Sequence, residues 1–274
     1  MNWNQFGYIC RVYSSKTLNA SQKAELTAQP HLAVYANERA DSKLANDLAA
    51  KLTLQDEATL QKQAVHYQCL PQLINGFKLE HKGLLSYLTI VFVIYVLSSL
   101  LYQFFVVPTF VEIYNNHTIS SEHTFDDYFS FWYVPIVLLA LLQCMIFAVI
   151  FKLKKASALI EMLPFSGLFT IFIPRKLINK YQRLIATLYF ALNFKVNEKN
   201  ASSETKHLAK CNSLGFDTDE EFKVLLKQQL EQFNLQAKSF INKLVILYGV
   251  VIVVSVYLFV KAAYQPIFIL GEVL

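Results

Sequence analysis

The residue types that most often do chemistry in proteins are sparse in this sequence, and their main concentration is one acidic segment. Six candidate metal ligands occur there: Glu112, His117, Glu122, His123, Asp126 and Asp127. Carboxylates and imidazoles can hold a metal ion, but the same composition is typical of a solvated acidic loop, which is the interpretation we favour. No C-x-x-C pair and no paired histidines accompany the cysteines, which are Cys10, Cys69, Cys144 and Cys211. We therefore expect reduced thiols and no metal site.

Motifs of the common catalytic machineries do not occur in the sequence. It contains no G-x-x-x-x-G-K-[ST] phosphate loop, no G-x-S-x-G nucleophile turn and no H-E-x-x-H metal motif. We expect no catalytic residue, no cofactor and no enzymatic activity.

Composition indicates an integral membrane protein with sizeable water-exposed parts. Of the 274 residues, 54% are hydrophobic and 16% are charged, and the mean hydropathy is +0.34. A soluble domain carries about 25% charged residues. Residues 1–15 lack a continuous apolar core and a small-residue cleavage site, so no signal peptide is expected.

The longest helical pattern covers residues 218–268 and combines two kinds of periodicity. Thr218 and Glu221 have the S/T-x-x-E spacing of a capping box, which predicts a helix start. One apolar stripe follows at steps of four and three residues, at Phe222, Leu226, Leu230, Phe233, Ala237, Phe240 and Leu244. Residues 244–260 carry no charge and are apolar on all sides, which is typical of a membrane span. We expect one helix that begins in water, continues in lipid and stops at Pro266.

Two further apolar stretches complete the membrane part of the predicted fold. The first is free of charge, and the second is closed by Lys152, Lys154 and Lys155. The predicted segments are a helical domain 1–82, transmembrane helix 83–107, external acidic loop 108–131, transmembrane helix 132–151, helical domain 152–241, transmembrane helix 242–264 and external tail 265–274. The fold class is therefore all-α: an integral membrane protein with three transmembrane helices and two small helical cytoplasmic domains.

Helical periodicity also marks the two polar domains. In the first, it predicts a helix over 38–53, and Asp56 is the expected cap of a second helix that ends near Tyr67. In the second, a helix is expected from Pro174 with a buried face at Leu177, Tyr181, Leu184, Leu188 and Leu192. A shorter helix places Leu208, Cys211 and Leu214 inside and stops at Gly215.

A basic stripe lies opposite the apolar face of the helix that follows Pro174. Its members, at i, i+4 and i+7, are Lys176, Lys180 and Arg183. Two interpretations stay open. The stripe is either a solvated face that touches anionic lipid headgroups or a docking surface for a cytoplasmic partner.

The distribution of lysine and arginine predicts the orientation. Nine of them lie in residues 1–82, fifteen in residues 152–243, one at Lys261 and none in the loop 108–131. By the positive-inside rule, both polar domains are cytoplasmic, the acidic loop is external and the C-terminal tail is external. The net charge of +5 is thereby explained by topology and requires no nucleic acid as a partner.

The sequence also contains one pattern that occurs twice. Each polar domain leads into a span that ends in Pro-x-Phe, at Pro108-Thr109-Phe110 and at Pro266-Ile267-Phe268. The two prolines are interpreted as terminating two related repeats, with the second span as their connector. Because proline commonly follows a helix end, coincidence is the alternative explanation.

These features together resemble a known family. Three spans, helical domains before the first and third, and the two proline motifs are similar to the type II secretion F family, the inner-membrane platform proteins of type II secretion systems and type IV pili. Leu163-Pro164-Phe165-Ser166-Gly167 is similar to the family's Leu-Pro-x-x-Gly after the second span, and residues 186–192 resemble the helix that follows it. The resemblance covers residues 84–270. Residues 211–216 depart from the family's Gly-Glu-x-x-Gly-x-Leu turn because they lack the glutamate.

The resemblance implies an inner-membrane scaffold that couples a cytoplasmic assembly ATPase to pilin or pseudopilin subunits. It also implies other inner-membrane assembly proteins as partners, a homo-oligomeric state and a location in the bacterial inner membrane. The alternatives are a small membrane transporter or channel subunit and a membrane sensor. Transport is disfavoured because the spans contain few polar residues, namely Ser98, Ser99, Gln103, Gln143 and Ser255.

Overall fold

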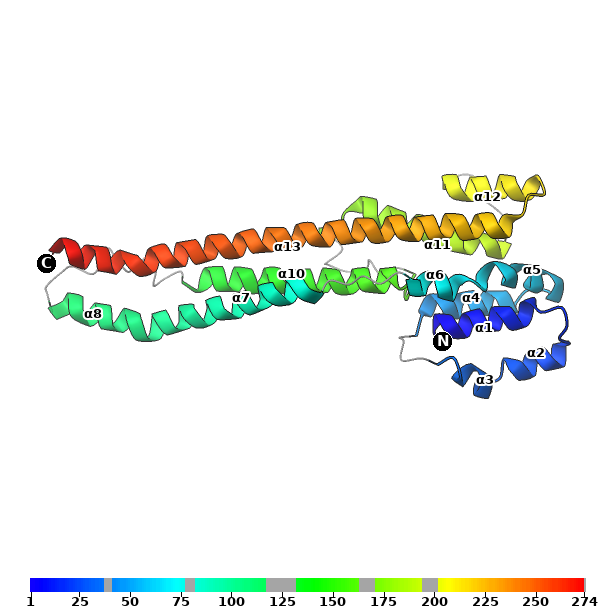
Figure 1. Cartoon of the computed structure of the whole chain (residues 1–274), viewed down its shortest axis with the longest axis horizontal. Helices are drawn as coiled ribbons and strands as arrows, with labels where there is room; N and C mark the ends of the chain where they lie inside the picture. The colour runs from blue at the N-terminus through cyan, green and yellow to red at the C-terminus, as the bar shows by residue number, and fades with distance from the viewer. Residues whose placement is uncertain (37–40, 77–81, 117–131, 163–170, 194–201, 274) are drawn as a thin grey trace. The chain divides into compact units, whose positions relative to one another are not determined.

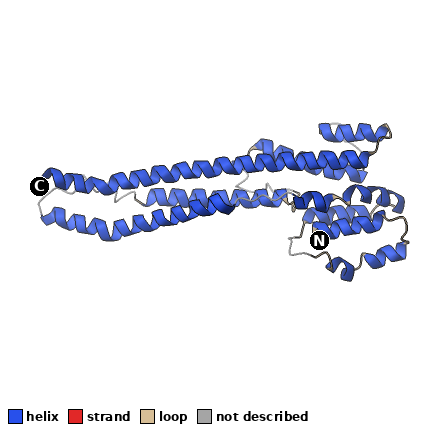
Figure 2. Ribbon diagram, in the orientation of Figure 1, coloured by secondary structure: helices blue, strands red, loops and turns tan. Residues whose placement is uncertain are grey.

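All regular structure in the part of the chain that is described is helical (Figure 2). The computed structural model describes residues 1–36, 41–76, 82–116, 132–162, 171–193 and 202–273, and no strand occurs within these ranges. In chain order (Figure 1), the elements are α1 (Trp3–Ser14), α2 (Ala20–Leu26), α3 (Gln29–Ala33), α4 (Lys43–Thr53), α5 (Glu57–Tyr67), α6 (Leu70–Gly76), α7 (Lys82–Leu101), the π-helical turn η1 (Tyr102–Val106), α8 (Val107–Asn116), α10 (Tyr133–Ser157), α11 (Arg175–Asn193), α12 (Ser203–Ser213) and α13 (Thr218–Val273). The all-α prediction is confirmed.

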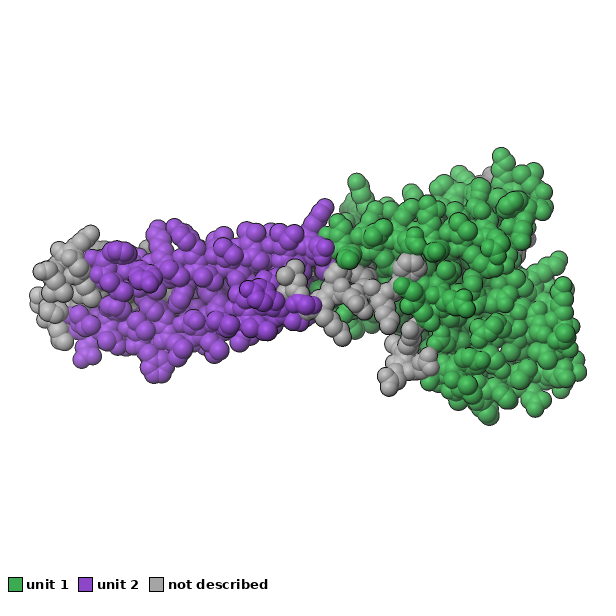
Figure 3. All heavy atoms as spheres, viewed as in Figure 1, with its two compact units in different colours: residues 1–79, 149–239 green, residues 80–148, 240–274 purple. Residues whose placement is uncertain are grey.

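The chain divides into two compact units, which Figure 3 colours separately. Unit 1 comprises residues 1–79 and 149–239, and unit 2 comprises residues 80–148 and 240–274. Two helices, α10 and α13, therefore contribute residues to both units.

Side-chain caps set the starts of several helices in unit 1. The Asn2 side chain accepts a hydrogen bond from the backbone of Gln5 and so begins α1, a helix that the sequence did not predict. Ser42 caps α4, which therefore begins later than the predicted helix over 38–53. Asp56 accepts from the Thr59 backbone at the start of α5, as predicted, and hydrogen bonding from Thr59 lowers the pKa of this carboxylate.

The two polar segments share one hydrophobic core. The ring of Tyr67 on α5 meets the edge of Phe6 on α1, with centroids 5.8 Å apart, and that of Phe222 on α13, at 6.0 Å. The Tyr67 hydroxyl donates to the backbone carbonyl of Leu188 on α11 at 2.6 Å, and burial raises its pKa well above the ordinary value for tyrosine. The predicted arrangement of two small helical domains, 1–82 and 152–241, is therefore corrected to one unit. A short helical segment buries too little apolar surface to be stable alone, so sharing a core is the favourable solution.

Unit 2 holds the apolar segments, and the three predicted transmembrane helices are confirmed as helices of sufficient length and hydropathy. The helices that qualify are Leu85–Ile113, Tyr133–Ser157 and Thr218–Phe268. Many large apolar side chains on them are exposed in the protein itself, such as Leu141, Val253 and Tyr257. Such exposure is unfavourable in water and favourable in lipid. The chain is accordingly a multi-span membrane protein.

The first span does not end at Pro108, contrary to the prediction. α8 contains this proline and continues to Asn116, directly after the π-helical turn η1. The backbone N–H of Val107 donates to the Tyr102 carbonyl, which widens the helix by one residue just before the proline. That widening gives the helix room to continue past a residue that has no N–H and whose ring crowds the preceding turn.

The last span does not end at Pro266 either. This proline lies inside α13, which runs on to Val273. Pro266 has no N–H to donate to the Ala262 carbonyl four residues earlier, and the Tyr102 hydroxyl donates to the adjacent carbonyl, that of Ala263, at 3.3 Å. Neighbouring side chains commonly satisfy backbone groups around a proline in membrane helices. Pro108 and Pro266 therefore do not terminate their helices, and the interpretation of two related repeats stays a prediction.

Two local predictions about the last helices are also corrected. α13 begins at Thr218, but the Asp217 carboxylate accepts from the backbone of Asp219 at 2.9 Å, in place of the expected Thr218–Glu221 capping box. On α12, Leu208 is buried as predicted, whereas Leu214 is 74% exposed. Gly215 adopts a positive φ of 70°, which explains why a glycine follows the end of α12.

Candidate functional site

α11 carries the candidate docking residues, and its apolar face determines where they point. Its predicted buried residues are all buried, at 3% exposure or less: Leu177, Tyr181, Leu184, Leu188 and Leu192. The Tyr181 ring packs on Phe233 of α13 with centroids 5.6 Å apart, and its hydroxyl donates to the Glu161 carbonyl. Because one face of the helix is held in the core of unit 1, the opposite face is fixed toward the surface.

The structure separates the three basic residues that the sequence grouped as one stripe. Lys176 and Arg183 are exposed. Lys180 is half-buried, and its Nζ donates to Oε1 of Gln232 on α13, 3.4 Å away. Arg175 is exposed as well, and the sequence analysis missed it because it stands one position before the i, i+4, i+7 series. The exposed positive charge of α11 therefore lies at Arg175, Lys176 and Arg183.

Arg183 differs from the other two because a carboxylate lies near it. Burial by itself would raise the pKa of Glu204 on α12, but hydrogen bonds from its own backbone and from the Ser203 and Ser202 side chains, together with the charge of Arg183, hold that pKa below the ordinary value. No ion pair in the described part of the chain involves Arg175 or Lys176. The first turn of α11 thus carries two positive charges that form no ion pair with the described residues of unit 1.

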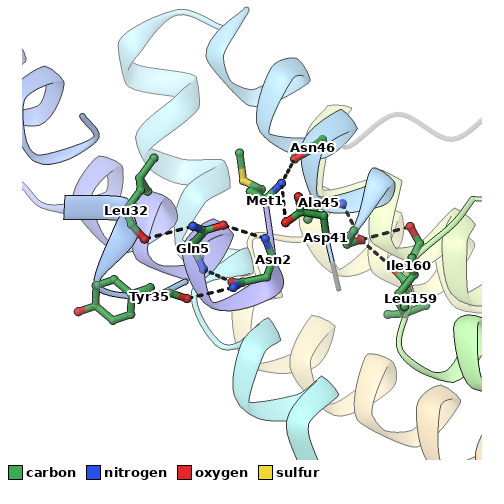
Figure 4. A network of polar contacts seen from close by, with 11 residues as sticks. Met1, Asn2, Gln5, Leu32, Tyr35, Asp41, Ala45, Asn46, Leu159 and Ile160 are labelled. Atoms are coloured by element: carbon green, nitrogen blue, oxygen red, sulfur yellow. Dashed lines mark hydrogen bonds and ion pairs between the residues drawn. The ribbon is translucent and has the colours of Figure 1, made fainter. Parts of the chain in front are cut away.

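The segment that directly follows α10 is bonded to the N-terminal part of the chain. The indole Nε1 of Trp3 donates to the Ala158 carbonyl at 3.0 Å, the Ser42 hydroxyl to the Leu159 carbonyl at 2.7 Å, and the Lys43 backbone to the Ile160 carbonyl at 2.8 Å. Figure 4 shows the Leu159 and Ile160 carbonyls facing that N-terminal part. The carbonyls of residues 158–160 lie directly after the end of α10 at Ser157, so these contacts tie that segment to the first helices.

The amino terminus of the chain lies beside these contacts and is held by polar contacts of its own. The amino group of Met1 donates to Oδ1 of Asn46 at 2.6 Å and lies 3.4 Å from an Asp41 carboxylate oxygen, as drawn in Figure 4. The Met1 carbonyl accepts from the Ser42 backbone at 3.0 Å. These bonds position the loop that carries Ser42 against α1, and so against the end of α10.

α13 is joined to α10 inside unit 1. The Ser157 hydroxyl, at the last residue of α10, and Oδ1 of Asn234 on α13 are 2.6 Å apart. Phe222, Leu226, Leu230, Phe233 and Ala237, on the same stretch of α13, are almost completely buried, as the apolar stripe predicted. The part of α13 before its uncharged stretch is consequently a central element of the soluble core.

Polar side chains within the apolar helices of unit 2 lie mainly where helices meet. Gln143 on α10 donates from Nε2 to the Thr89 hydroxyl on α7 at 2.6 Å, which confirms the expected bond across a helix contact. Ser99, Gln143 and Ser255 are buried, whereas Ser98 is exposed. The Gln143 carbonyl oxygen and the Tyr248 hydroxyl are buried without a partner among the described residues. These groups contribute helix packing, and none of them is ionised at neutral pH.

One cluster combines residue types that elsewhere do chemistry. Nε2 of His207 on α12 lies 3.0 Å from a carboxylate oxygen of Glu221 on α13 and 3.6 Å from the Cys211 sulfur. Both contacts use the same ring nitrogen, so the three do not form a relay in which each nitrogen has its own partner. Within the described residues, no group of three or more His, Cys, Asp or Glu side chains is arranged to hold a metal ion. The cluster joins α12 to the start of α13.

The remaining candidates for chemistry divide between two places. Glu112 lies on α8, whereas the other members of the hypothesised acidic site, His117, Glu122, His123, Asp126 and Asp127, fall outside the described residues, as does Leu163-Pro164-Phe165-Ser166-Gly167. All four cysteines are unpaired. Cys10 is buried, and that burial raises the pKa of its thiol, which makes it unreactive in the folded protein.

Comparison with known proteins gives no match of any kind. No protein-family model matches this chain, no curated protein matches it, and no solved structure matches it. The architecture combines three membrane-length helices, one hydrophobic core shared by the two polar segments, and two helices, α10 and α13, that belong to both units.

Proposed function

We propose that this protein is a membrane scaffold of a pilus or secretion machine, the platform on which pilin or pseudopilin subunits are assembled. Its work would be mechanical: it would couple a cytoplasmic assembly ATPase to subunits in the bilayer, together with other assembly proteins and further copies of itself. The location we propose is the bacterial inner membrane, with unit 1 in the cytoplasm and both the 117–131 segment and the C-terminus outside. The charge distribution along the sequence supports this orientation.

The observation that carries the proposal is the continuity of α13. One helix runs from Thr218 to Val273, with its first part buried in unit 1 and its second part uncharged from Leu244 to Val260. A continuous helix transmits a displacement along its axis because its backbone hydrogen bonds resist local bending. A force applied to unit 1 would therefore reach the membrane part of the same helix.

The proposed ATPase contact is the surface of α11 around Arg183. Exposed residues next to it on the same face are Asn179, Gln182 and Ala186. Of the three candidate docking residues, Lys180 is engaged with Gln232, whereas Lys176 and Arg183 are exposed; Arg183 is the one that we propose meets an acidic residue of the ATPase. A like-charge contact at such an interface costs several kcal/mol.

Interrupting α13 tests the proposal directly. Leu235 is exposed on α13, so Leu235→Ala removes little packing, whereas Leu235→Pro breaks the helix at a cost of about 3 kcal/mol or more. We expect Leu235→Pro to reach the membrane at normal levels and to abolish pilus assembly or secretion, while Leu235→Ala retains both. Normal assembly with Leu235→Pro would show that coupling does not pass through a continuous helix.

Partner capture separates the scaffold from its rivals. The tagged full-length chain, purified from its native membrane, should retain an assembly ATPase and a pilin-like subunit, and Arg183→Glu should release the ATPase. Reversing the matching acidic residue on the ATPase should restore binding. Substrate-dependent flux through the chain reconstituted alone would instead support a transporter or channel subunit, and the scaffold proposal would then be abandoned.

A further inference from the structure

Two large apolar side chains stand out on the surface of unit 1, just before α11. Ile171 is 82% exposed and Phe172 is 50% exposed, and both belong to a short 3₁₀ turn. The next residue, Ile173, is buried at 3% exposure and anchors this turn to the core. The Pro174 carbonyl accepts the first helical bond of α11, from the Leu177 backbone at 2.9 Å. Ile171 and Phe172 are therefore held in an outward position, because buried Ile173 follows them and α11 begins directly afterwards.

Positive charge adjoins this pair. Arg175 and Lys176 follow within one helical turn, both are exposed, and neither forms an ion pair in the described part of the chain. Exposed aromatic and aliphatic side chains beside guanidinium and ammonium groups are the combination that binds the interface of an anionic bilayer. The apolar groups enter the region between headgroups and acyl chains, and the cations contact phosphates.

The position of the pair within unit 1 agrees with that chemistry. α11 and α13 run in opposite directions, because Lys180 contacts Gln232 while Leu188 lies near Phe222, both being in contact with Tyr67. Moving from Lys180 toward the start of α11 thus corresponds to moving along α13 past Gln232 toward Ser239. Ile171 and Phe172 lie at this end of the unit, and the uncharged stretch of α13 begins five residues after Ser239, at Leu244.

Another exposed aromatic in unit 1 lies at the opposite end. Phe216 is 60% exposed and precedes α13, so it is separated from Ser239 by the whole soluble length of that helix, about 33 Å at 1.5 Å per residue. Its nearest charged neighbour in sequence is Asp217, which is acidic. Phe172 and Phe216 are therefore the same residue type with similar exposure, but they differ in position and in the charge beside them.

We propose that Ile171, Phe172, Arg175 and Lys176 form a membrane-interface anchor, which inserts into the headgroup region of an anionic phospholipid bilayer. The anchor would hold the start of α11, and with it the core of unit 1, against the membrane surface. This property depends on the lipid alone. It does not require an ATPase, a pilin or any other protein, and it stands or falls separately from the scaffold function.

A fluorescent label at position 172 tests the anchor in the full-length chain. Cys69, Cys144 and Cys211 are replaced by serine, while buried Cys10 is kept because it does not react in the folded protein. Phe172→Cys is labelled with an environment-sensitive dye, and the purified chain is placed in nanodiscs that contain phosphatidylglycerol. We expect a blue-shifted emission that is quenched by lipids carrying a nitroxide near the headgroup.

Matched variants decide the outcome. Phe216→Cys, labelled in the same way, should be quenched by iodide from the water and not by the nitroxide lipid. Ile171→Cys should behave like Phe172→Cys, which guards against a local failure of one variant to fold. Arg175→Glu with Lys176→Glu, or phosphatidylcholine alone, should reduce the lipid quenching at position 172.

Two results would overturn the proposal. The first is equal lipid quenching at positions 172 and 216, which would show no specific anchor. The second is an iodide-accessible label at 172 in anionic nanodiscs that becomes protected only in native membranes. In that case a protein, and not the bilayer, covers this surface.

Discussion

The two parts of α13 follow opposite rules. In the first part of the helix, the buried residues are apolar and the exposed ones are mostly polar: Phe233 is buried, for example, whereas Lys227 and Lys238 are exposed. In the second, exposure no longer separates residue types, because Val250, Val253 and Tyr257 are all more than half exposed. The comparison shows that an apolar stripe indicates which face of a helix packs against protein. A helix that is apolar on all sides indicates only that it lies in lipid, and not which face meets another helix.

The units that share α13 differ in the same way. Unit 1 closes its core with side chains from distant segments and pairs polar groups across them, as Tyr67 does with Leu188. Among its described residues, unit 2 also pairs polar groups, as Gln143 does with Thr89, but it leaves large apolar side chains exposed, such as Leu141 and Val253. The first unit is thus stabilised by its own core, and the second depends on the bilayer to cover what it exposes.

The largest expected difference between the two parts of α13 is in packing. Phe233 has no exposed surface, and Phe233→Ala should destabilise unit 1 by about 3–5 kcal/mol because it leaves a cavity in the shared core. Val253→Ala, at an exposed site of the second part, should change stability by less than about 1 kcal/mol. Denaturant unfolding in micelles, followed by near-ultraviolet circular dichroism, measures both. Similar losses would contradict the assignment of Val253 to the lipid-facing surface.

A charge placed on an exposed site of each part gives the next largest effect. Val253→Arg places a cation near the middle of the uncharged stretch and should reduce insertion by the equivalent of about 2.5–3.5 kcal/mol. Leu235→Arg, on the exposed face of the first part, should stay within about 0.5 kcal/mol of the natural protein. The fraction of each variant that resists alkaline extraction from membranes measures insertion. Equal insertion would place residues 244–260 in water.

A pH-dependent contact in unit 1 should give the smallest effect. Burial alone would raise the pKa of Asp47, but hydrogen bonds from Lys51 and Tyr189 hold it below the ordinary value. A carboxylate with a lowered folded pKa contributes stability above its unfolded pKa, near 4, and loses it as pH falls through the folded pKa. Tyr189→Phe should therefore cost about 1 kcal/mol at pH 7, discounted because Asp47 is partly exposed.

The same variant has a built-in control at low pH. Once Asp47 is protonated in both proteins, the difference between Tyr189→Phe and the natural protein should shrink, since the charge-assisted bond is then absent from both. Unfolding at pH 7 and at a series of lower pH values that passes through the folded pKa of Asp47 compares the two. A constant difference across that range would mean that the tyrosine hydroxyl contributes packing and not a bond to an ionised carboxylate.

Much of the fold follows from local patterns that a sequence displays directly. Hydropathy identified the three spans, and the spacing of Leu177, Tyr181 and Leu184 identified the buried face of α11. Asp56 was recognisable as a cap because its carboxylate satisfies a backbone donor three residues away. Each of these depends on neighbours within one or two turns, so no knowledge of the rest of the molecule was needed.

The predictions that were wrong concern features that depend on contacts between distant segments. Residues 1–79 and 149–239 form one unit because apolar faces of their helices pack against each other. The apolar stripe of a single helix shows which face is buried but not which helix it packs against. The prolines at 108 and 266 were predicted to end their helices because proline removes a backbone donor. Both helices continue instead, with a π-helical turn before Pro108 and with Tyr102 of another helix bonded to the Ala263 carbonyl near Pro266. Neither feature belongs to the Pro-x-Phe motif itself.

The candidate site shows the same division between sequence and tertiary structure. The sequence by itself determined that α11 is amphipathic and that basic residues gather on its outer side. Only the tertiary structure decided that Lys180 contacts Gln232 and that Arg183 lies near Glu204. It also decided that Arg175 and Lys176, which form no ion pair with the residues that the structure describes, follow an exposed apolar pair. Helical periodicity fixes the direction of a side chain, but the groups it meets there are set by long-range packing.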